Sequence, residues 1–370
     1  MLRNKKVLIV GSGISGITIA ALLKATNPDQ DLTIIEERNH IGGNLYDYER
    51  DGMFIQKYGP HVIHTSNKSV WDFFVNHTEM YRYQHKVAGS VDGQHITMPM
   101  NLNGLKDVLS DYLYNQFEDH MHENYEYDNE ISLYTMMNHG DAVIRTVAKH
   151  IYENILLNYT MKQWNLPPEK VDRNLLQCAN FRFNKDSRYY DEPYQGVPLY
   201  GYTKMFENIC NIYKLKIQFN TSFKYHMLND YDIIFYTGSI ENPELHNYQI
   251  SDVLPYVGVN VSVYQQHNKL PAAVVNYPNM YNFTRMTDYS YFNRDWDKDY
   301  TYISVEYPYE CKDSKFYPVD TKENRQIYRD IKHKLPLNVI PCGRLGNYKY
   351  MTIGQTVEEA FNLIQKYQKQ

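Results

Sequence analysis

Three glycines near the start of the chain have the spacing of a dinucleotide-binding turn. Gly11, Gly13 and Gly16 follow a short apolar run at residues 7–10 and precede an apolar stretch of helical spacing at residues 17–23. In this order of strand, turn and helix, the first glycine permits a tight turn and the second lets the backbone approach a pyrophosphate. The third lets the helix pack closely on the strand. The phosphates would lie at the positively charged N-terminus of the helix.

An acidic residue and a second glycine pair extend this pattern. Residues 32–35 predict a second strand that ends at Glu36, which lies 20 residues after Gly16, the spacing at which a carboxylate meets the ribose hydroxyls of an adenosine half. Gly42 and Gly43 would place more bare backbone beside the first turn. Such backbone suits the isoalloxazine end of FAD, so we expect FAD and not NAD.

The elements that must position these residues are those of an α/β protein with a discontinuous Rossmann-like FAD domain. Helical spacing is expected at residues 70–84 and 202–213, and Asp92-Gly93 predicts the turn of a β ribbon over residues 86–98. Residues 101–164 are mostly helical in pattern. Late strands of the FAD domain are expected at 215–219 and 233–238, where the second ends in Thr-Gly. An antiparallel sheet is expected over 250–310, and a strand, turn and helix over 339–363.

These patterns predict three domains. The FAD-binding domain would comprise residues 1–80, 196–245 and 320–370. A helical domain would comprise residues 100–175. An antiparallel sheet domain would comprise residues 81–99, 176–195 and 246–319.

Composition excludes several classes of partner. The net charge of −5, from 38 basic and 43 acidic residues, gives no electrostatic footprint for nucleic acid. The four cysteines form no CxxC pair, so we expect no metal site and reduced thiols in a cytoplasmic protein. No run approaches the roughly 18 apolar residues needed to span a bilayer, so we expect no membrane insertion.

Several further motifs share one order along nearly the whole chain and resemble the UDP-galactopyranose mutase family, flavoenzymes that interconvert pyranose and furanose forms of a sugar nucleotide. Each motif alone is modest. The matching segments are Glu36, residues 38–44 (Arg-Asn-His-Ile-Gly-Gly-Asn), 58–65 (Tyr-Gly-Pro-His-Val-Ile-His-Thr), 158–164 (Asn-Tyr-Thr-Met-Lys-Gln-Trp), 189–196 (Tyr-Tyr-Asp-Glu-Pro-Tyr-Gln-Gly), 201–204 (Gly-Tyr-Thr-Lys), 283–285 (Phe-Thr-Arg), 306–308 (Glu-Tyr-Pro), 316–319 (Phe-Tyr-Pro-Val) and 343–350 (Gly-Arg-Leu-Gly-Asn-Tyr-Lys-Tyr).

The resemblance implies three sets of site residues and no metal ligands. The catalytic set is Arg285, Tyr317, Tyr350 and His61. The FAD-binding set is Gly11, Gly13, Ser15, Gly16, Glu36, Arg38, Gly42, Gly43, Asn44, His61, Val62, Arg344, Tyr350 and Thr352. The substrate-binding set is Tyr159, Thr160, Trp164, Tyr189, Asn276, Arg285, Tyr317 and Tyr350.

The resemblance also implies a mechanism and a setting. Reduced FAD would use its N5 as the nucleophile on the anomeric carbon and expel the nucleoside diphosphate, and the sugar ring would open, reclose through another hydroxyl and recapture the diphosphate. The guanidinium of Arg285 would hold that diphosphate. The protein would be a homodimer that acts on UDP-galactopyranose and supplies a furanose donor for surface polysaccharide.

The chain departs from the family pattern at a loop arginine. Eleven residues before Tyr189, where the family carries an arginine that closes on the diphosphate, stands Cys178. Arg173 and Arg182 are nearby but not in register. The missing contact is worth on the order of 1.5–3 kcal/mol in a closed site.

Further departures leave the substrate open. Thr352 stands where the family usually has aspartate, His85 replaces a common asparagine near the sugar, and Ile155 and Leu156 replace aromatics found beside the base in some members. A dTDP-linked sugar such as dTDP-fucopyranose is therefore an alternative substrate. A flavin amine oxidase-like oxidoreductase, which shares the N-terminal turn, and a non-catalytic nucleotide-sugar binder are alternatives of other classes.

Overall fold

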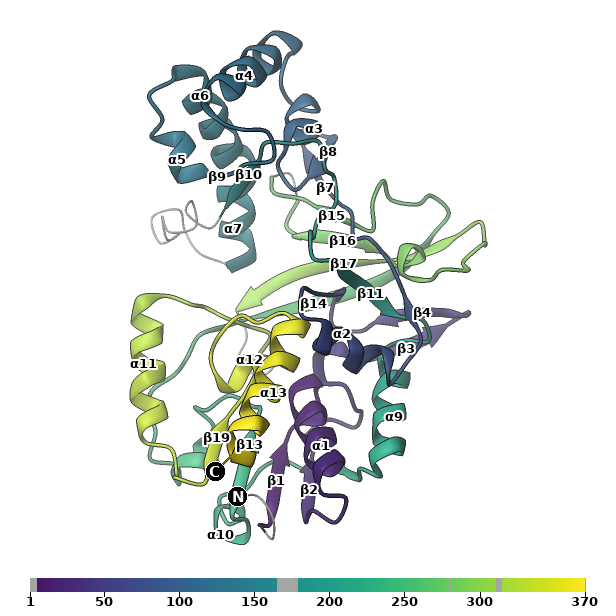
Figure 1. The fold of residues 1–370 in the computed structure, drawn as a ribbon, viewed down its shortest axis with the longest axis vertical. Helices are drawn as coiled ribbons and strands as arrows, with labels where there is room; N and C mark the ends of the chain where they lie inside the picture. The colour runs from purple at the N-terminus through teal and green to yellow at the C-terminus, as the bar shows by residue number, and fades with distance from the viewer. Residues whose placement is uncertain (1–4, 165–178, 280, 311–314, 370) are drawn as a thin grey trace. The chain divides into compact units, whose positions relative to one another are not determined.

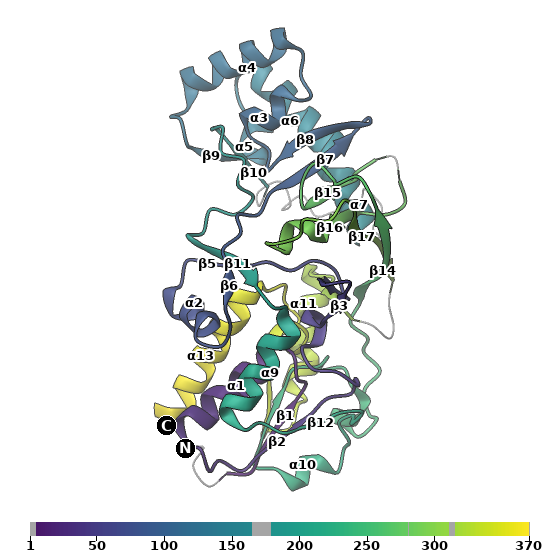
Figure 2. The same ribbon diagram turned by 90° about the vertical axis from the view of Figure 1, so that its right-hand side faces the viewer.

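Two compact units make up the chain, and Figures 1 and 2 show them in a computed structural model. The structure describes residues 5–164, 179–279, 281–310 and 315–369. Unit 1 comprises Met1–Tyr83, Glu192–Gly258 and Glu310–Gln370. Unit 2 comprises Gln84–Asp191 and Val259–Tyr309. The predicted helical segment and the predicted antiparallel sheet both fall largely in unit 2, and their division into separate domains stays a prediction.

Unit 1 is built on a five-stranded parallel sheet in the order β12-β2-β1-β13-β19. Its strands are β1 (Val7–Val10), β2 (Leu32–Ile35), β12 (Ile217–Gln218), β13 (Ile233–Tyr236) and β19 (Val339–Pro341). Strands β1, β2 and β13 are nearly continuous apolar runs, which is the pattern of parallel strands buried on both faces. All three run in register, so their carboxyl ends meet at one edge of the sheet.

Apolar side chains cover both faces of this sheet. On one face pack α1 (Ile14–Thr26), α2 (Lys68–Val75), α9 (Tyr202–Tyr213) and α13 (Ile353–Lys369), and α1, α9 and α13 lie side by side in both ribbon views. Leu8, Ile234 and Tyr236 point to the other face and pack against Phe223 and Leu245. The doubly covered parallel sheet confirms the predicted Rossmann-like core.

Smaller elements complete unit 1. They are β3 (Asp47–Arg50), β4 (Met53–Gln56), β5 (Ile63–Thr65), β6 (Met80–Tyr81), β11 (Tyr194–Pro198), β18 (Tyr317–Pro318), α10 (Met227–Asp230), α11 (Lys322–His333), α12 (Gly343–Gly346), and the 3₁₀ turns η1 (Gly43–Leu45) and η4 (Pro243–His246).

One predicted helix is shorter than expected. The pattern at residues 70–84 predicted a single helix, but α2 begins after the cap Asn67, which accepts a hydrogen bond from the Ser69 N–H, and ends at Val75. The chain then forms β6, in which Met80 pairs with Pro198 of β11. A strand pairing between distant segments therefore overrides the local helical spacing.

Unit 2 joins a mixed sheet to a group of helices. Its strands are β7 (Val87–Val91), β8 (Gln94–Met98), β9 (Glu130–Ser132), β10 (Asn180–Arg182), β15 (Val274–Asn276), β16 (Arg285–Asp288) and most of β14 (Tyr256–Gln266) and β17 (Thr301–Glu310). Its helices are α3 (Leu102–Lys106), α4 (Asp111–Asn124), α5 (Leu133–Met137), α6 (Ala142–Ile151), the π-helix η2 (Tyr152–Leu156), α7 (Leu157–Trp164) and the 3₁₀ turn η5 (Tyr289–Phe292).

Local signals account for much of unit 2. Asp92 and Gly93 have φ of 49° and 81°, which are the left-handed conformations that a tight hairpin turn requires, and they join β7 to β8 as predicted. The side chains of Ser110, Ser132 and Asp141 cap the N-termini of α4, α5 and α6. Strands β15 and β16 pair antiparallel, as do β16 and β17.

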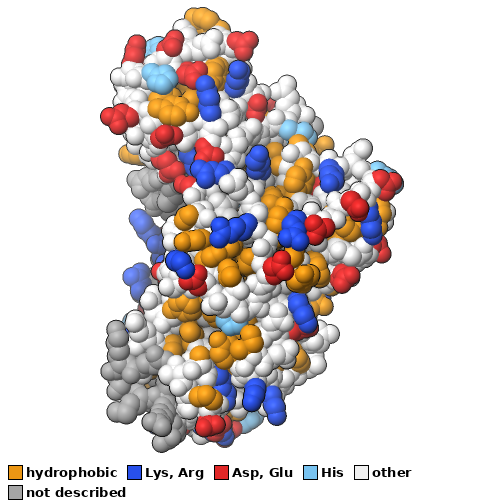
Figure 3. All heavy atoms as spheres, turned by 45° about the vertical axis from the view of Figure 1, so that its right-hand side comes forward, with side chains coloured by type: hydrophobic (Ala, Val, Ile, Leu, Met, Phe, Trp, Pro, Cys, Tyr) orange, Lys and Arg blue, Asp and Glu red, His pale blue; other side chains and the backbone are white. Residues whose placement is uncertain are grey.

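Charged side chains of both signs occur on the surface. On the face that Figure 3 shows, acidic and basic side chains are interspersed. Among the described residues, no helix combines the length and the apolar character needed to cross a bilayer.

A buried carboxylate fixes the start of α9. Gly201 precedes this helix at φ 82° and offers no capping side chain. Asp47, which is 4% exposed, accepts hydrogen bonds from the N–H groups of Tyr202 (2.6 Å) and Thr203 (2.8 Å). Burial raises the pKa of Asp47, and these hydrogen bonds oppose that rise. The cap comes from a residue far away in the sequence, so it has no local signal.

We predict that Asp47→Ala destabilises the protein by about 1–3 kcal/mol, because two buried N–H groups lose their acceptor. Chemical denaturation gives the free energy of unfolding. Asp47→Asn, which keeps one acceptor oxygen, should lose less, and Asp29→Ala at an exposed turn should lose nothing measurable. Equal stability of Asp47→Ala and wild type would refute the capping role.

Candidate functional site

A pocket of about 220 Å³ opens at the carboxyl ends of β1, β2 and β13 in unit 1. Carboxyl strand ends are where open α/β sheets bind their ligands. Its walls come from several stretches of the chain that are far apart in sequence. The lining residues are Val10, Gly11, Gly13, Ile14, Ser15, Glu36, Glu37, Arg38, Gly42, Gly43, Asn44, Leu45, His61, Thr221, Ser222, Phe223, Tyr236, Thr237, Gly238, Asn242, Gly343, Arg344, Leu345, Ile353 and Thr356.

The three positions of the first turn differ in whether and why the structure requires glycine there. Gly11 has φ 101°, and a Cβ there would lie 2.1 Å from Thr237 Oγ1. A Cβ on Gly16 would lie 2.0 Å from the Gly11 carbonyl oxygen, so this glycine lets α1 pack on β1. A Cβ on Gly13 would meet nothing nearer than Gly43 Cα at 3.7 Å. The protein alone therefore does not require glycine at position 13, whereas a ligand held close to the backbone would.

The N-terminus of α1 points at this pocket without a side-chain cap. Gly13 is the N-cap residue and offers no capping oxygen, while Ile14 and Ser15 of the first turn line the pocket. The N–H groups of the first turn and the helix dipole therefore favour an anion at this place. A pyrophosphate is the anion that this arrangement fits.

Glu36 is held at one end of the pocket, directly after β2. Its carboxylate accepts hydrogen bonds from the Ser12 N–H (2.8 Å), the Ser12 hydroxyl (2.9 Å) and the Arg38 N–H (2.9 Å). It is 5% exposed and lines the pocket. Three donors fix its orientation, and carboxylate oxygens keep further lone pairs for ribose hydroxyls.

The second glycine pair packs against the first turn. The Gly42 N–H donates to the Ser12 carbonyl (3.0 Å), and a Cβ on Gly43 would lie 3.0 Å from Gly13 Cα. Gly42 and Gly43 have φ of 96° and 56°. Two stretches of bare backbone therefore face each other across the pocket wall, as the sequence predicted.

Aromatic and cationic side chains hold the loop that carries this pair. The guanidinium of Arg38 donates to Asn44 Oδ1 (3.1 Å) and lies over the Tyr58 ring at 4.7 Å. His40 stacks on Tyr46 at 3.9 Å between ring centroids and its Nε2 is hydrogen-bonded to the Tyr58 hydroxyl (2.8 Å). Burial and the nearby cations lower the pKa of His40, so this ring is neutral at pH 7.

His61 reaches the pocket from the turn before β5. Its N–H donates to Gln56 Oε1 (2.6 Å), and its carbonyl accepts from the Tyr202 hydroxyl (2.9 Å). Its Nδ1 lies 2.9 Å from the Gly59 carbonyl oxygen. Since a carbonyl can only accept, Nδ1 carries a proton in this arrangement.

Arg344, on α12 directly after β19, lines the pocket. Its guanidinium donates to the Met351 carbonyl (2.7 Å), and its Cζ lies 5.3 Å from the Tyr317 ring and 4.9 Å from the Tyr350 ring. Those two rings stack on each other at 6.2 Å. The Gly343 N–H donates to the Glu359 carboxylate (2.9 Å). This turn therefore places one arginine and two tyrosines together.

Unit 1 thus brings together most of the predicted FAD-binding residues. Those that line the pocket are Gly11, Gly13, Ser15, Glu36, Arg38, Gly42, Gly43, Asn44, His61 and Arg344. Gly16 lies behind it, and Val62, Tyr350 and Thr352 are outside its lining. Thr352 caps α13, since its hydroxyl accepts from the Gln355 N–H (3.2 Å) while Gln355 accepts from the Thr352 N–H (3.0 Å).

Sequence reasoning missed one wall of the pocket. Thr221, Ser222 and Phe223 follow β12, and Asn242 donates to the hydroxyl of the buried Tyr236 (2.8 Å). Burial raises the pKa of that hydroxyl. The available signal was that residues 221–223 directly follow a predicted parallel strand, whose carboxyl end faces the pocket.

Unit 2 holds the predicted substrate-binding residues other than Tyr317 and Tyr350, which belong to unit 1. Tyr159, Thr160 and Trp164 lie on α7. Asn276 and Arg285 are paired in register on β15 and β16. Tyr189 lies beside His85, whose carbonyl accepts its N–H (2.9 Å).

Arg285 is paired with a buried acid. It stands directly opposite Glu306 across β16 and β17, and its Nε lies 2.7 Å from Glu306 Oε1. The Glu306 side chain is 2% exposed and that of Arg285 is 20% exposed. The ion pair uses Nε and fixes the plane of the guanidinium, a planar fork that suits phosphate oxygens.

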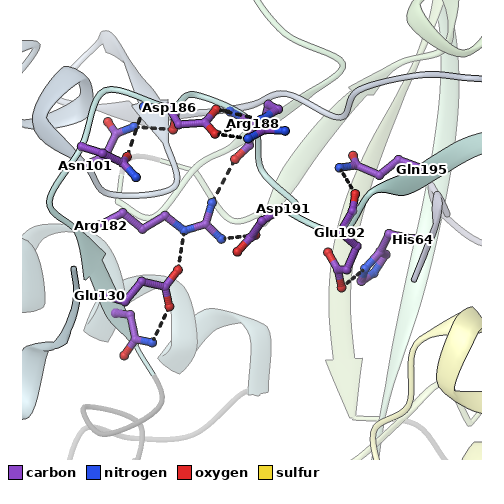
Figure 4. Close-up of polar contacts among 11 residues, drawn as sticks. His64, Asn101, Glu130, Arg182, Asp186, Arg188, Asp191, Glu192 and Gln195 are labelled. Carbon is purple, nitrogen blue, oxygen red and sulfur yellow. Dashed lines mark hydrogen bonds and ion pairs between the residues drawn. The ribbon is translucent and has the colours of Figure 1, made fainter. Parts of the chain in front are cut away.

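The guanidinium of Arg182 is engaged by other residues, so Arg182 is not suited to replace the loop arginine. Its guanidinium pairs with Glu130 (3.1 Å) and Asp191 (2.7 Å) and donates to the Arg188 carbonyl (3.1 Å), as Figure 4 shows. These contacts fasten the segment before Tyr189 to β9. Cys178 and Arg173 lie outside the described residues.

The other departures are placed as follows. His85 is 5% exposed and stacks on Tyr190 at 5.5 Å. Ile155 is part of the helical core of unit 2, and Leu156 packs against that core. In unit 1, His64 pairs with Glu192 at 2.8 Å, also drawn in Figure 4. Among the described residues, no three His, Cys, Asp or Glu side chains form a metal-binding group.

The fold and pocket define a Rossmann-type dinucleotide-binding protein, and a family model described as an NAD(P)-binding Rossmann-like domain matches residues 9–76. A model of UDP-galactopyranose mutase matches residues 154–350, more than half of the chain. The chain therefore belongs to the UDP-galactopyranose mutase family and is an isomerase.

Individual relatives agree with this assignment. The chain is 29% identical to a Klebsiella pneumoniae protein named "Probable UDP-galactopyranose mutase", over 97% of this chain and 94% of that protein. It is 27% identical to an Escherichia coli protein named dTDP-fucopyranose mutase, over 98% of each. A crystal structure of reduced UDP-galactopyranose mutase matches 100% of this chain and 94% of that chain with a TM-score of 0.71 at 16% identity, which speaks for the fold.

We predict that Gly13→Ala abolishes cofactor retention without disturbing the fold. The added Cβ has room within the protein but occupies the space where the backbone approaches a pyrophosphate. Cofactor per mole of purified protein should fall about tenfold or more, while the apo protein unfolds at the wild-type temperature. Gly16→Ala is the matched control and should destabilise the apo protein itself. Full cofactor content in Gly13→Ala would contradict the assignment of this pocket.

Glu359 generates a pH-dependent prediction. Burial raises its pKa in the folded state, against the opposing hydrogen bonds from the Gly343 N–H and the Asn347 amide. Between the ordinary glutamate pKa and the raised pKa of the folded state, the folded protein binds more protons than the unfolded chain. The free energy of unfolding that Glu359 contributes therefore increases as the pH falls through this range. Relative to Glu359→Gln, the wild type should gain unfolding free energy as the pH falls toward the ordinary glutamate pKa of about 4.3. Parallel pH curves would refute this; Glu49→Gln, at an exposed position, is the control.

Proposed function

We propose that this chain is a flavin-dependent sugar-nucleotide mutase that interconverts the pyranose and furanose forms of its substrate. The observation that carries the proposal is the wall of bare backbone at Gly13 and Gly43, between Glu36 and Arg344, in a chain of the UDP-galactopyranose mutase family. This wall suits FAD, whose pyrophosphate and isoalloxazine both need close backbone approach.

The residues of unit 1 would hold FAD along the pocket. Glu36 would accept hydrogen bonds from the ribose, and the N–H groups at the start of α1 would receive the pyrophosphate. Arg344 and His61 would contact the flavin end. When bound and reduced, FAD supplies the nucleophile, its N5, for the anomeric carbon.

The protein's own part in the reaction is positioning and charge stabilisation. Arg285, oriented by Glu306, would hold the diphosphate while it is detached from the sugar, and the hydroxyls of Tyr317 and Tyr350 would donate hydrogen bonds to the same group. Tyr159 and Trp164 would contact the base. Tyr189 and Asn276 would bind further parts of the nucleotide, and Thr160 would support Tyr159 from its buried position.

UDP-galactopyranose is the first substrate to test, and dTDP-fucopyranose is the second. The names of the two relatives support both, and their identities to this chain differ little. The product would be a furanose donor for surface polysaccharide, made by a cytoplasmic homodimer. Family membership favours this reaction over that of a flavin amine oxidase.

The deciding experiment incubates dithionite-reduced enzyme with UDP-galactopyranose and with dTDP-fucopyranose and resolves furanose products by chromatography. We expect furanose from one of the two. In the same assay, Arg285→Ala should lower turnover about 100-fold, because the diphosphate loses its fork of donors.

One control variant and two contrary outcomes complete this experiment. Arg294→Ala removes an exposed arginine of the same unit and should leave turnover unchanged. Hydrogen peroxide release under air with no furanose from either nucleotide sugar would replace the mutase with an oxidase. Full turnover of Arg285→Ala would show that the diphosphate is held elsewhere.

A further inference from the structure

Lys162 is the charged residue of the 158–164 motif, and the proposed function gives it no role. Its ammonium donates to the carbonyl oxygens of Tyr277 (2.5 Å) and Phe283 (3.1 Å). Asn158, four residues earlier and therefore on the same face of α7, donates to Asn279 Oδ1 (2.9 Å). Two side chains of α7 thus fasten it to the connection between β15 and β16.

The connection that receives these bonds has its own internal contacts. The Tyr277 N–H donates to the Thr284 carbonyl (2.8 Å), which closes its base. The Phe283 ring lies 4.8 Å from Tyr277 and stacks on Tyr281 at 4.9 Å. Lys162 therefore holds α7 against a connection that is stabilised by its own internal contacts.

The environment of the ammonium explains why carbonyls are needed. Lys162 is half-buried, and this burial lowers its pKa. A charge removed from water requires acceptors, and hydrogen bonds in which the donor is ionised are stronger than neutral ones. Removal of the ammonium therefore leaves two carbonyls without this donor and α7 without these two bonds to the connection.

What Lys162 joins are the two halves of the candidate nucleotide site in unit 2. Tyr159 precedes it by less than one helical turn, and Asn276 and Arg285 stand at the two ends of the connection. We propose that Lys162 is a positioning residue that sets the spacing between the base-binding helix and the diphosphate-binding hairpin. This inference rests on the proposed function.

A fixed spacing has a specific thermodynamic signature. A nucleoside diphosphate engages both halves at once, so its affinity includes the advantage of binding the second half intramolecularly. A nucleoside alone or pyrophosphate alone engages one half and gains nothing from the spacing. Loss of Lys162 should therefore weaken the joined ligand and spare its fragments.

The test is titration calorimetry of the holoenzyme with UDP, uridine and inorganic pyrophosphate, and with dTDP and thymidine as the second series. Lys162→Met should bind the nucleoside diphosphate about tenfold more weakly and each fragment within about twofold of wild type. Lys162→Arg, which keeps the charge and the donors, should recover most of the loss. Lys149→Met, at an exposed lysine on α6, is the matched control and should change nothing.

The outcomes separate this inference from the function on which it rests. If wild type binds neither UDP nor dTDP, the proposed function fails. If it binds one of them and Tyr159→Ala and Arg285→Ala weaken that binding, an unchanged affinity of Lys162→Met overturns the inference alone. Equal weakening of the nucleoside diphosphate and both fragments would also overturn it. Should Lys162→Met fail to fold, Asn158→Ala must give the same selective loss at about threefold, and its absence refutes the proposal.

Discussion

The close approach of two glycine backbones is the constraint on which unit 1 depends. Gly13 and Gly43 come within van der Waals contact, and Gly16 lies directly on the Gly11 carbonyl. This approach requires that β1 ends where it does, that α1 starts without a side-chain cap, and that the loop before η1 runs back over the turn. The ring of Phe206 on α9 supports that loop from behind, because a Cβ on Gly42 would lie 3.2 Å from it.

The polar groups around this backbone are oriented before any ligand arrives. Glu36 accepts three hydrogen bonds from its own neighbourhood, Arg38 is held by Asn44, and Arg344 is held by the Met351 carbonyl. Groups fixed in this way lose little conformational entropy on binding and need no reorganisation during a reaction. The many tyrosines contribute here as rigid surfaces: Tyr58 supports Arg38, and Tyr317 and Tyr350 flank Arg344.

Where the sequence predicted the structure, the signal was local. The glycine turn, the strands of the parallel sheet, the Asp92-Gly93 hairpin and the helix at 202–213 all follow from spacing or turn chemistry within a few residues. Where prediction failed, the cause was a distant partner: β6 exists because Met80 pairs with Pro198, and Asp47 caps a helix more than 150 residues away. The capping box of Thr352 and Gln355 also has a local signal, since a threonine is followed three residues later by a glutamine. The roles of Arg285 and Tyr159 came from family resemblance, since an isolated arginine or tyrosine carries no such meaning.

The internal organisation of the two units bears on how such a protein could change its substrate. The lining residues of the cofactor pocket all belong to unit 1, and Glu36, Arg38 and Arg344 are held by contacts within that unit. The candidate nucleotide residues on α7, β15 and β16 have contacts within unit 2, through Lys162 and Glu306. Substitutions such as His85, Ile155 and Leu156 all fall in unit 2. Changes at such positions leave every contact that shapes the cofactor pocket as it is, and the chain is about equally similar to two relatives named for different nucleotide sugars.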